Sequence, residues 1–204
     1  MKYTAFLLLS GFICITFFGC SSREKITTLE QLKGKEFAVP TGTIADQLVL
    51  SKIPDAKFKY FNSVLDACIA VKGGKADAAA YDEPILRNIA AKNPGMVVLP
   101  DMITTDKYGF AVRLDDEELQ KTIDAILDEL KANGNYDLML KRWLPDKGTP
   151  QPMPQIEMGN EGILKFGTAA VTEPFSFVDG SHEIVGLDIE LASLVAQRLN
   201  KKLE

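Results

Sequence analysis

Two short stretches of this sequence carry groups that complement the two charges of a small zwitterion. Gly42-Thr43 follows an apolar run and opens a helical pattern, so it offers backbone N–H groups and a hydroxyl to a carboxylate. Asp82 follows the small-residue run 76–81 and offers a carboxylate to an ammonium group. In an open α/β sheet, both positions lie at the carboxyl ends of strands, where ligands bind. These residues are therefore candidates for a ligand site.

Strand and helix patterns alternate around these positions and predict how they are held. Thr43 and Ser63 stand where helix N-caps are expected. The alternation indicates an α/β fold, with a parallel or mixed sheet and helices on both faces. We expect strands at 36–39, 57–61, 76–81 and 96–99, and helices at 43–53, 64–72 and 84–92.

The pattern changes after this unit. Residues 106–113 read as a strand that leaves the unit, and a long amphipathic helix at 119–130 and a short helix at 136–143 follow. Proline, glycine and polar residues then predict a linker at 145–162. The strand–turn–helix pattern after the linker begins with a strand at 164–167 and is too short to close a core by itself.

Size, composition and charge limit the classes of function. A chain of 204 residues with 46% hydrophobic and 25% charged residues could form one large or two small globular domains. A net charge of −5 and a pI of about 5.1 give no sign of a nucleic-acid-binding surface. No Ser/His/Asp set, Cys/His pair or phosphate-binding loop is visible, so we predict a protein that is not an enzyme and needs no cofactor.

Two further residues that could do chemistry have simpler interpretations. Cys68 lies on the apolar face of a predicted helix and is expected in the core. His182 is the only histidine, has no second ligand at metal spacing, and is expected to be exposed. We therefore predict neither a metal site nor an intramolecular disulfide in the mature protein.

The first 20 residues read as a targeting segment. Lys2 precedes an apolar run of about 14 residues, which is short for a membrane-spanning helix and suits a signal peptide. The run ends Gly19-Cys20-Ser21-Ser22, which resembles a bacterial lipoprotein cleavage site, although Phe17 and Phe18 depart from its usual pattern. We expect Cys20 to carry a lipid such as palmitate and to anchor the body on the periplasmic side of the cell envelope. The alternatives are a plain secretory signal and an uncleaved anchor, and both also place the body outside the cytoplasm.

Several motifs together resemble the bacterial extracellular solute-binding proteins of family 3, the periplasmic binding proteins of amino-acid ABC transporters. The resemblance covers nearly everything after Ile26 and implies the two-lobed type II fold of that family. Three motifs match lobe two: its entry (Leu29–Lys35), an anion-binding turn (Thr41–Thr43) and an acidic strand end (Gly74–Asp82). The other three are the crossing strand (Tyr108–Val112), the terminal helices (Leu130–Trp143) and the start of lobe one (Gly167 to Ile189).

The resemblance implies roles for particular residues. Asp82 would bind the α-amino group of a ligand, and Gly42 and Thr43 would hold its α-carboxylate. Phe175 and Thr172 would face the cleft from lobe one. The simpler interpretations are a helix N-cap for Asp82, a plain turn for Gly42-Thr43 and core packing for Phe175.

Three departures from the family pattern bear on the ligand. Ile44 stands where a second hydroxyl is common, so carboxylate binding would be weaker or different. Thr172 stands where many members have an aromatic residue, and Ala169 stands where members that bind cationic side chains often have an acid. The departures at Thr172 and Ala169 both argue against a lysine- or arginine-type ligand.

The lobes follow an unusual order, because the family runs lobe one first with lobe two inserted in it. A circular permutation would give this order, and we then expect a fragment of a longer protein that continues lobe one after residue 204. The alternative is a remnant of one binding domain followed by the start of a second. The segments are a signal peptide (1–20), lobe two (21–113), terminal helices that pack on lobe one (114–144), a linker (145–162) and the incomplete start of lobe one (163–204).

The leading hypothesis is a lipid-anchored lobe that binds an amino acid or similar small polar solute and delivers it to the permease of an ABC importer. One alternative is a periplasmic enzyme of the same fold, either a cyclohexadienyl dehydratase with Glu173 as its spare acid or a protein with a fused lytic transglycosylase domain. Another is the ligand-sensing domain of a membrane receptor.

Overall fold

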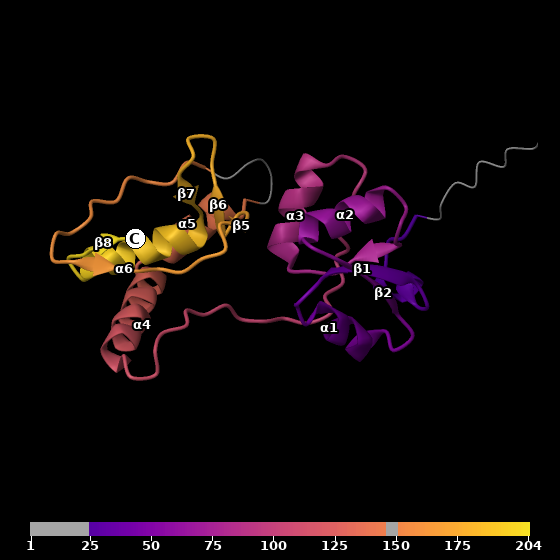
Figure 1. The fold of residues 1–204 in the computed structure, drawn as a ribbon, viewed down its shortest axis with the longest axis horizontal. Helices are drawn as coiled ribbons and strands as arrows, with labels where there is room; N and C mark the ends of the chain where they lie inside the picture. Colours follow the sequence, from indigo (N-terminus) through magenta and orange to yellow (C-terminus); the bar gives the residue numbers. More distant parts are fainter. Residues whose placement is uncertain (1–24, 146–150) are drawn as a thin grey trace, which may run out of the picture.

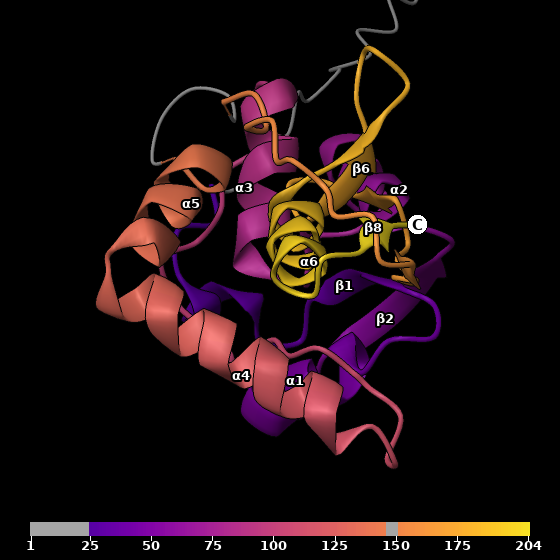
Figure 2. The same ribbon diagram turned by 90° about the vertical axis from the view of Figure 1, so that its left-hand side faces the viewer.

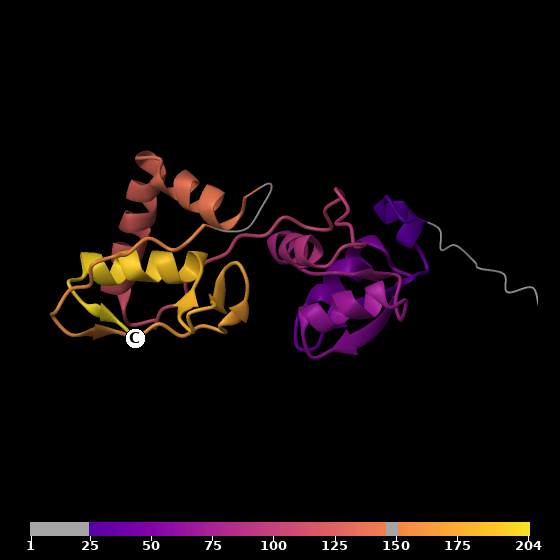
Figure 3. The ribbon, with the colours of Figure 1, turned by 90° about the horizontal axis from the view of Figure 1, so that it is seen from above.

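The computed structural model describes residues 25–145 and 151–204, so the predicted leader, Cys20 and part of the predicted linker lie outside the described residues. The described chain forms a first unit, from η1 to α3, and a second unit, from α4 to β8. Residues 93–116 run from one unit to the other and are called the connecting segment (Figures 1 and 3). Within the described residues, no helix has the length and apolar character needed to span a membrane.

The first unit alternates strands and helices, as predicted. Its elements are η1 (Leu29–Leu32), β1 (Glu36–Pro40), α1 (Ala45–Lys52), β2 (Lys57–Phe61), α2 (Val64–Lys72), β3 (Ala78–Ala79) and α3 (Glu83–Lys92).

The three strands form a parallel sheet in the order β2-β1-β3. Successive residues of the central strand β1 point to opposite faces, and both faces are covered. Phe37 and Val39 belong to the same buried cluster as Val49 of α1, whereas Ala38 belongs to a cluster with Ala67 of α2. Helices on both faces of a parallel sheet were predicted from the sequence, and this prediction is confirmed.

One of the two predicted helix caps is correct. Ser63 caps α2, because its Oγ accepts a hydrogen bond of 3.0 Å from the Asp66 N–H. The prediction that Thr43 is an N-cap is wrong, because α1 begins at Ala45 and Ile44 holds the N-cap position. The Thr43 hydroxyl instead supports the turn that leads into α1, so the helix starts later than its apolar pattern indicates.

Strands were predicted at 96–99 and 106–113, and both predictions are wrong. The predicted strand at 76–81 shortens to Ala78–Ala79, so the free edge of the sheet offers few backbone groups to a further strand. Leu99 and Ile103 of the connecting segment still pack against the buried cluster of the first unit. Phe110 packs elsewhere, with its ring centroid 5.9 Å from that of Phe166 in the second unit. Tertiary packing has therefore overridden the alternating pattern of the sequence.

The second unit is built around one helix. Its elements are α4 (Glu117–Ala132), α5 (Asn135–Trp143), β4 (Ile163–Leu164), β5 (Val171–Thr172), β6 (Ser176–Val178), β7 (Ile184–Val185), α6 (Leu187–Arg198) and β8 (Lys202–Leu203). The predicted strand at 164–167 is therefore only two residues long. Helix α6 lies between the α4–α5 pair and the short strands β6 and β8 (Figure 2).

The apolar faces of the three helices meet in one core. Buried residues recur at helical spacing on each of them, as expected for amphipathic helices that share a core. They are Ile123, Ile126 and Leu130 of α4, Met139 and Trp143 of α5, and Leu187, Leu191 and Val195 of α6.

A buried carboxylate joins α6 to α5. Glu190 is 3% exposed, and its two oxygens accept hydrogen bonds of 2.6 Å from Arg142 Nη1 and from the Trp143 indole N–H. A buried charge is tolerated when it is paired and hydrogen-bonded, and both conditions hold here. The interaction therefore fixes the position of α5 against α6.

We predict that Glu190→Ala lowers the free energy of unfolding by about 2–4 kcal/mol, because Trp143 and Arg142 lose their buried acceptor. Urea denaturation followed by far-ultraviolet circular dichroism measures the change. The matched control is Glu129→Ala, which removes the exposed ion pair of α4 with Arg198 of α6 and should cost less than about 1 kcal/mol. Equal losses in the two variants would contradict the role assigned to Glu190.

Candidate ligand-binding site

The two candidate stretches leave the sheet from the same edge. Strands β1 and β3 are parallel neighbours, with Phe37 opposite Ala78 and Ala38 opposite Ala79. Gly42-Thr43 follows β1, and Asp82 follows β3. The carboxyl ends of parallel strands meet at one edge of a sheet, so these residues stand together there.

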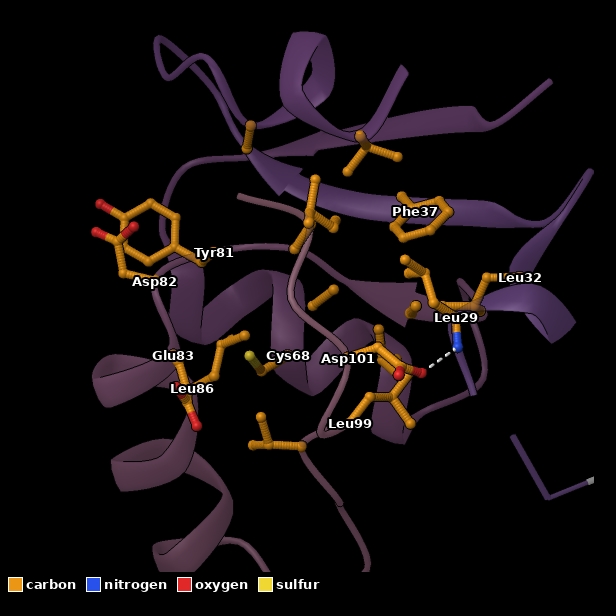
Figure 4. A pocket seen from close by; sticks show the side chains of 18 of the residues that line it. Leu29, Leu32, Phe37, Cys68, Tyr81, Asp82, Glu83, Leu86, Leu99 and Asp101 are labelled. Atoms are coloured by element: carbon orange, nitrogen blue, oxygen red, sulfur yellow. Dashed lines mark hydrogen bonds between the residues drawn. The ribbon is translucent and has the colours of Figure 1, made fainter. Parts of the chain in front are cut away.

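Thr43 and Asp82 line one cavity of about 1030 Å³ beside the sheet. Its lining is mainly apolar. The acids that Figure 4 labels lie toward opposite ends, with Asp82 beside Tyr81 and Glu83, and Asp101 near Leu29; Asp77 and Asp106 also line the cavity. The Asp101 carboxylate accepts a hydrogen bond of 2.8 Å from the Leu29 N–H, so it supports the local structure. An apolar cavity with few polar groups is typical of small-molecule sites. The labelled apolar residues that line the cavity are Leu29, Leu32, Phe37, Cys68, Leu86 and Leu99.

The Gly42-Thr43 turn can offer backbone groups more readily than its hydroxyl. The Thr43 hydroxyl donates a hydrogen bond of 3.0 Å to the Pro40 carbonyl, so its proton is already used. Gly42 is exposed and has φ of 79°, a left-handed conformation that favours glycine. The neighbouring Ile44 side chain is 62% exposed and adds apolar surface. A ligand carboxylate here would therefore depend on backbone N–H groups.

Asp82 holds the N-cap position of α3, but its side chain makes no capping hydrogen bond. Within the part of the chain that the structure describes, Asp82 takes part in no ion pair. Its residue is exposed at the cavity, where it lies beside Tyr81 (Figure 4). The carboxylate is thus less committed to local structure than the helix-cap interpretation implies.

Tyr108 was not identified as a site residue from the sequence. It lines the same cavity as Asp82, and its ring centroid lies 5.0 Å from that of Phe175 in the second unit. Desolvation and, second, a side-chain hydrogen bond with Asp82 raise the pKa of the Tyr108 hydroxyl. The motif around Tyr108 predicted a strand, and no spacing rule in the sequence connects this residue to Asp82.

The two candidates from the second unit do not line the cavity. Phe175 is 7% exposed and belongs to the hydrophobic core, which is the simpler of its two interpretations. Thr172 is half-buried and pairs with Ser176 between β5 and β6. The structure therefore brings Thr43 and Asp82 to one cavity, with Gly42 next to Thr43 but not in the lining. Phe175 contacts this cavity only through the ring of Tyr108.

Two acids of the second unit lie near the first unit. Glu173 forms an ion pair with Lys92 of α3. Asp188, in the first turn of α6, is close enough to Tyr108 to contribute to the raised pKa of that hydroxyl. Burial raises the pKa of the Asp188 carboxyl itself. Tyr108 thus has an acid from each unit, Asp82 and Asp188, among the causes of its raised pKa.

The interpretations of Cys68 and His182 hold. Cys68 is 4% exposed in the core, and His182 is exposed. In residues 25–145 and 151–204, no group of three or more histidine, cysteine, aspartate or glutamate residues could hold a metal ion.

Burial raises the pKa of the Cys68 thiol from 9.0 to about 11. The unfolded thiol ionises first, so its stabilising contribution is complete below about pH 9 and is lost as the pH rises toward about 11. We predict that the free energy of unfolding falls less steeply over this range in Cys68→Ala than in the natural protein. Urea titrations at several pH values measure the two slopes, and the shared lysines and tyrosines cancel in the comparison. Equal slopes would contradict the burial effect.

Comparison with curated proteins gives several amino-acid-binding proteins. The glutamine-binding protein GlnH of a Bacillus subtilis ABC transporter is 32% identical over 124 residues, which is 60% of this chain and 45% of that protein. A putative arginine-binding protein of an Escherichia coli ABC transporter is 27% identical over 58% of this chain and 51% of that protein. The chain therefore spans about half the length of these relatives. No protein-family model matches the sequence.

A longer alignment joins the chain to a different class of protein. The virulence sensor protein BvgS of Bordetella bronchiseptica is 24% identical over 177 residues, which is 82% of this chain and 14% of that protein.

Solved structures share the fold. A mutant of the Thermotoga maritima protein ArgBP is 37% identical with a TM-score of 0.51, over 61% of this chain and 54% of that one. An ancestral amino acid-binding protein, described as a precursor of cyclohexadienyl dehydratase, is 33% identical with a TM-score of 0.51, over 60% of this chain and 53% of that one. The homologues of this chain are thus amino-acid-binding proteins of ABC transporters, and the predicted fold class, a lobe like that of a periplasmic binding protein, is confirmed.

Proposed function

We propose that this chain is part of an extracytoplasmic solute-binding protein that supplies an amino acid or similar small polar solute to an ABC importer. One observation carries the proposal. The Gly42-Thr43 turn and the Asp82 carboxylate leave adjacent parallel strands at the same edge, and Thr43 and Asp82 line one cavity.

The chemistry at this edge suits a ligand that carries both charges. The ammonium group would bind Asp82, because a charge-assisted hydrogen bond to a carboxylate is stronger than one between neutral groups. The carboxylate would bind backbone N–H groups of the turn before α1. Phe175 and Thr172 would meet the ligand only when the second unit closes on the first, through a hinge in the connecting segment.

The segment assignments follow from the same proposal. Residues 21–113 serve as lobe two, 114–144 as terminal helices on lobe one, 145–162 as a linker and 163–204 as part of lobe one. The contacts of α4 and α5 with α6 support the second of these assignments. Cys20 carries the lipid anchor on the periplasmic side of the envelope, so the partners are the solute, the membrane and the permease.

A catalytic role has less support than binding. The glutamine-binding and arginine-binding relatives named above are binding proteins, and the precursor of a dehydratase among the solved structures is itself described as an amino acid-binding protein. The acid that a dehydratase would need was assigned to Glu173, and this carboxylate is paired with Lys92. A general acid or base must be free to exchange a proton with the substrate. We therefore propose that the chain binds its solute without changing it.

A sensor domain is the second candidate, and one observation favours it. The alignment with this sensor covers 82% of the chain, which is about 167 of 204 residues. A stretch of that length must include residues 38–167, so the alignment runs from the first unit through the predicted linker. The sensor protein therefore shares the order of segments found here. A sensor would use the same ligand site and pass the change in contact between the units to a signalling domain.

We predict that Asp82→Asn weakens the binding of an amino-acid ligand at least about tenfold, because an amide leaves the ammonium without a charge partner. Isothermal titration calorimetry of the complete gene product with L-glutamine and with L-arginine measures the change. The matched control is Asp101→Asn at the other end of the cavity, where an amide oxygen can still accept the Leu29 N–H. Equal affinities of Asp82→Asn and the natural protein would contradict the site.

A further inference from the structure

Helix α3 carries an apolar stripe that begins at Asp82 and continues along the cavity. Residues that follow Asp82 by four, seven and eight positions lie on the same face of a helix, and these positions hold Leu86, Ile89 and Ala90. All four residues line the cavity, and Figure 4 shows Leu86 below Asp82. Leu86 is half-buried and Ile89 is 8% exposed. A ligand group that extends from Asp82 along this face of α3 therefore meets apolar side chains first.

The strand that precedes α3 leaves space beside this stripe. Every residue of the run 76–80 except Asp77 is alanine, and all five residues line the cavity. An alanine side chain is one methyl group, so it fills less of the interior than the larger side chains that usually pack there. The cavity volume of about 1030 Å³ lies at the upper end of the range for small-molecule sites. The cavity can therefore hold a large side chain as well as the charged groups of an amino acid.

The charged residues of the cavity lining are used locally. Among the described residues, five acids line the cavity. Asp77 and Asp101 each accept a hydrogen bond from a backbone N–H, of 3.0 and 2.8 Å. Asp106 accepts one of 2.7 Å from a threonine hydroxyl, and Glu83 forms an ion pair. The fifth acid is Asp82, which would hold the α-ammonium group. The lysines of the lining are all exposed, so water competes for them. A charged end of a ligand side chain would have to compete with these local partners.

These features define the class of the ligand. We infer that the solute is a primary α-amino acid with a bulky apolar side chain, whose ammonium group binds Asp82 and whose side chain lies in the cavity along Leu86 and Ile89. This inference rests on the proposed function and names the class of solute that the same site takes. Burial of an apolar side chain is favourable, whereas burial of an unpaired polar or charged end costs free energy. The site therefore prefers an aliphatic or aromatic side chain to that of glutamine, lysine or arginine.

The test is calorimetric titration of the complete gene product with L-alanine, L-norvaline and L-norleucine. These amino acids share their charged groups and differ only in the length of the side chain. Each added methylene group should raise the affinity by about threefold to fourfold, the factor expected when it leaves water for apolar surroundings. L-Lysine is L-norleucine with a second ammonium group at the end of the side chain, and it should bind at least about tenfold more weakly.

The variant Leu86→Ala tests where the ligand side chain lies. It removes the apolar group one helical turn after Asp82, so the affinity for L-norleucine should fall by about fivefold to tenfold. The affinity for L-alanine, whose side chain is one methyl group, should fall by a smaller factor. The matched control is Leu65→Ala, because Leu65 is 48% exposed on α2 outside the cavity and its loss should change neither affinity. Far-ultraviolet circular dichroism checks that both variants fold, and equal losses for the two ligands in Leu86→Ala would overturn the inference.

The binding outcomes separate this inference from the proposed function. If L-glutamine, L-lysine or L-arginine binds at least as tightly as L-norleucine, or if the affinity does not rise from L-alanine to L-norleucine, the inference is overturned and the proposed function stands. If none of these amino acids binds, both are overturned. Hexanoate is L-norleucine without its ammonium group, so equal binding of hexanoate would show that the apolar chain binds without Asp82 and would also overturn the inference. Rising affinity along the series, with weaker binding of hexanoate, supports it.

Discussion

The parallel pairing of β1 with β3 is the constraint on which the candidate site depends. Because the strands run in the same direction, the chain leaves both of them at one edge, and the turn before α1 meets the start of α3 there. The central strand can hold this register because both of its faces are buried, by α1 on one side and α2 on the other. A shift by one residue would exchange the faces of Phe37 and Ala38, which differ greatly in volume. Packing in the sheet therefore determines where the carboxylate of Asp82 stands.

Two acids show how the same side-chain chemistry is used for structure in one place and left without a cation in another. Glu190 is buried, and its oxygens accept from Arg142 and Trp143, so its hydrogen bonds hold α5 against α6. Asp82 is exposed, and its neighbour Tyr108 is neutral. A carboxylate that already has a cation gains little from a second one, whereas a carboxylate without an ion pair gains a full charge partner. The difference lies in the neighbours and not in the acids.

The sequence predicted the parts of the structure that local chemistry decides. The strands of β1 and β2, the cap at Ser63, the α4–α5 pair and the buried Cys68 followed from periodicity, capping preference and apolar faces. The sequence-based predictions failed where contacts with other residues override the local pattern. The run 106–113 alternates like a strand, but Phe110 packs on Phe166. Thr43 looks like a helix cap, but its hydroxyl is used by Pro40. For the site, Gly42, Thr43 and Asp82 were named from their positions after strands, while Tyr108 depends on a contact between units that no local pattern encodes.

The connecting segment relates the site to the second unit. Its residues pack in two directions: Leu99 and Ile103 pack against the buried cluster of the first unit, whereas the rings of Tyr108 and Phe110 pack against Phe175 and Phe166. A segment that contacts both units responds to the arrangement of both. Any molecule that prefers one arrangement shifts the population toward it by the difference in binding free energy, and no more. The connecting segment, in which two strands were predicted, is therefore the part of the described chain that packs against both units.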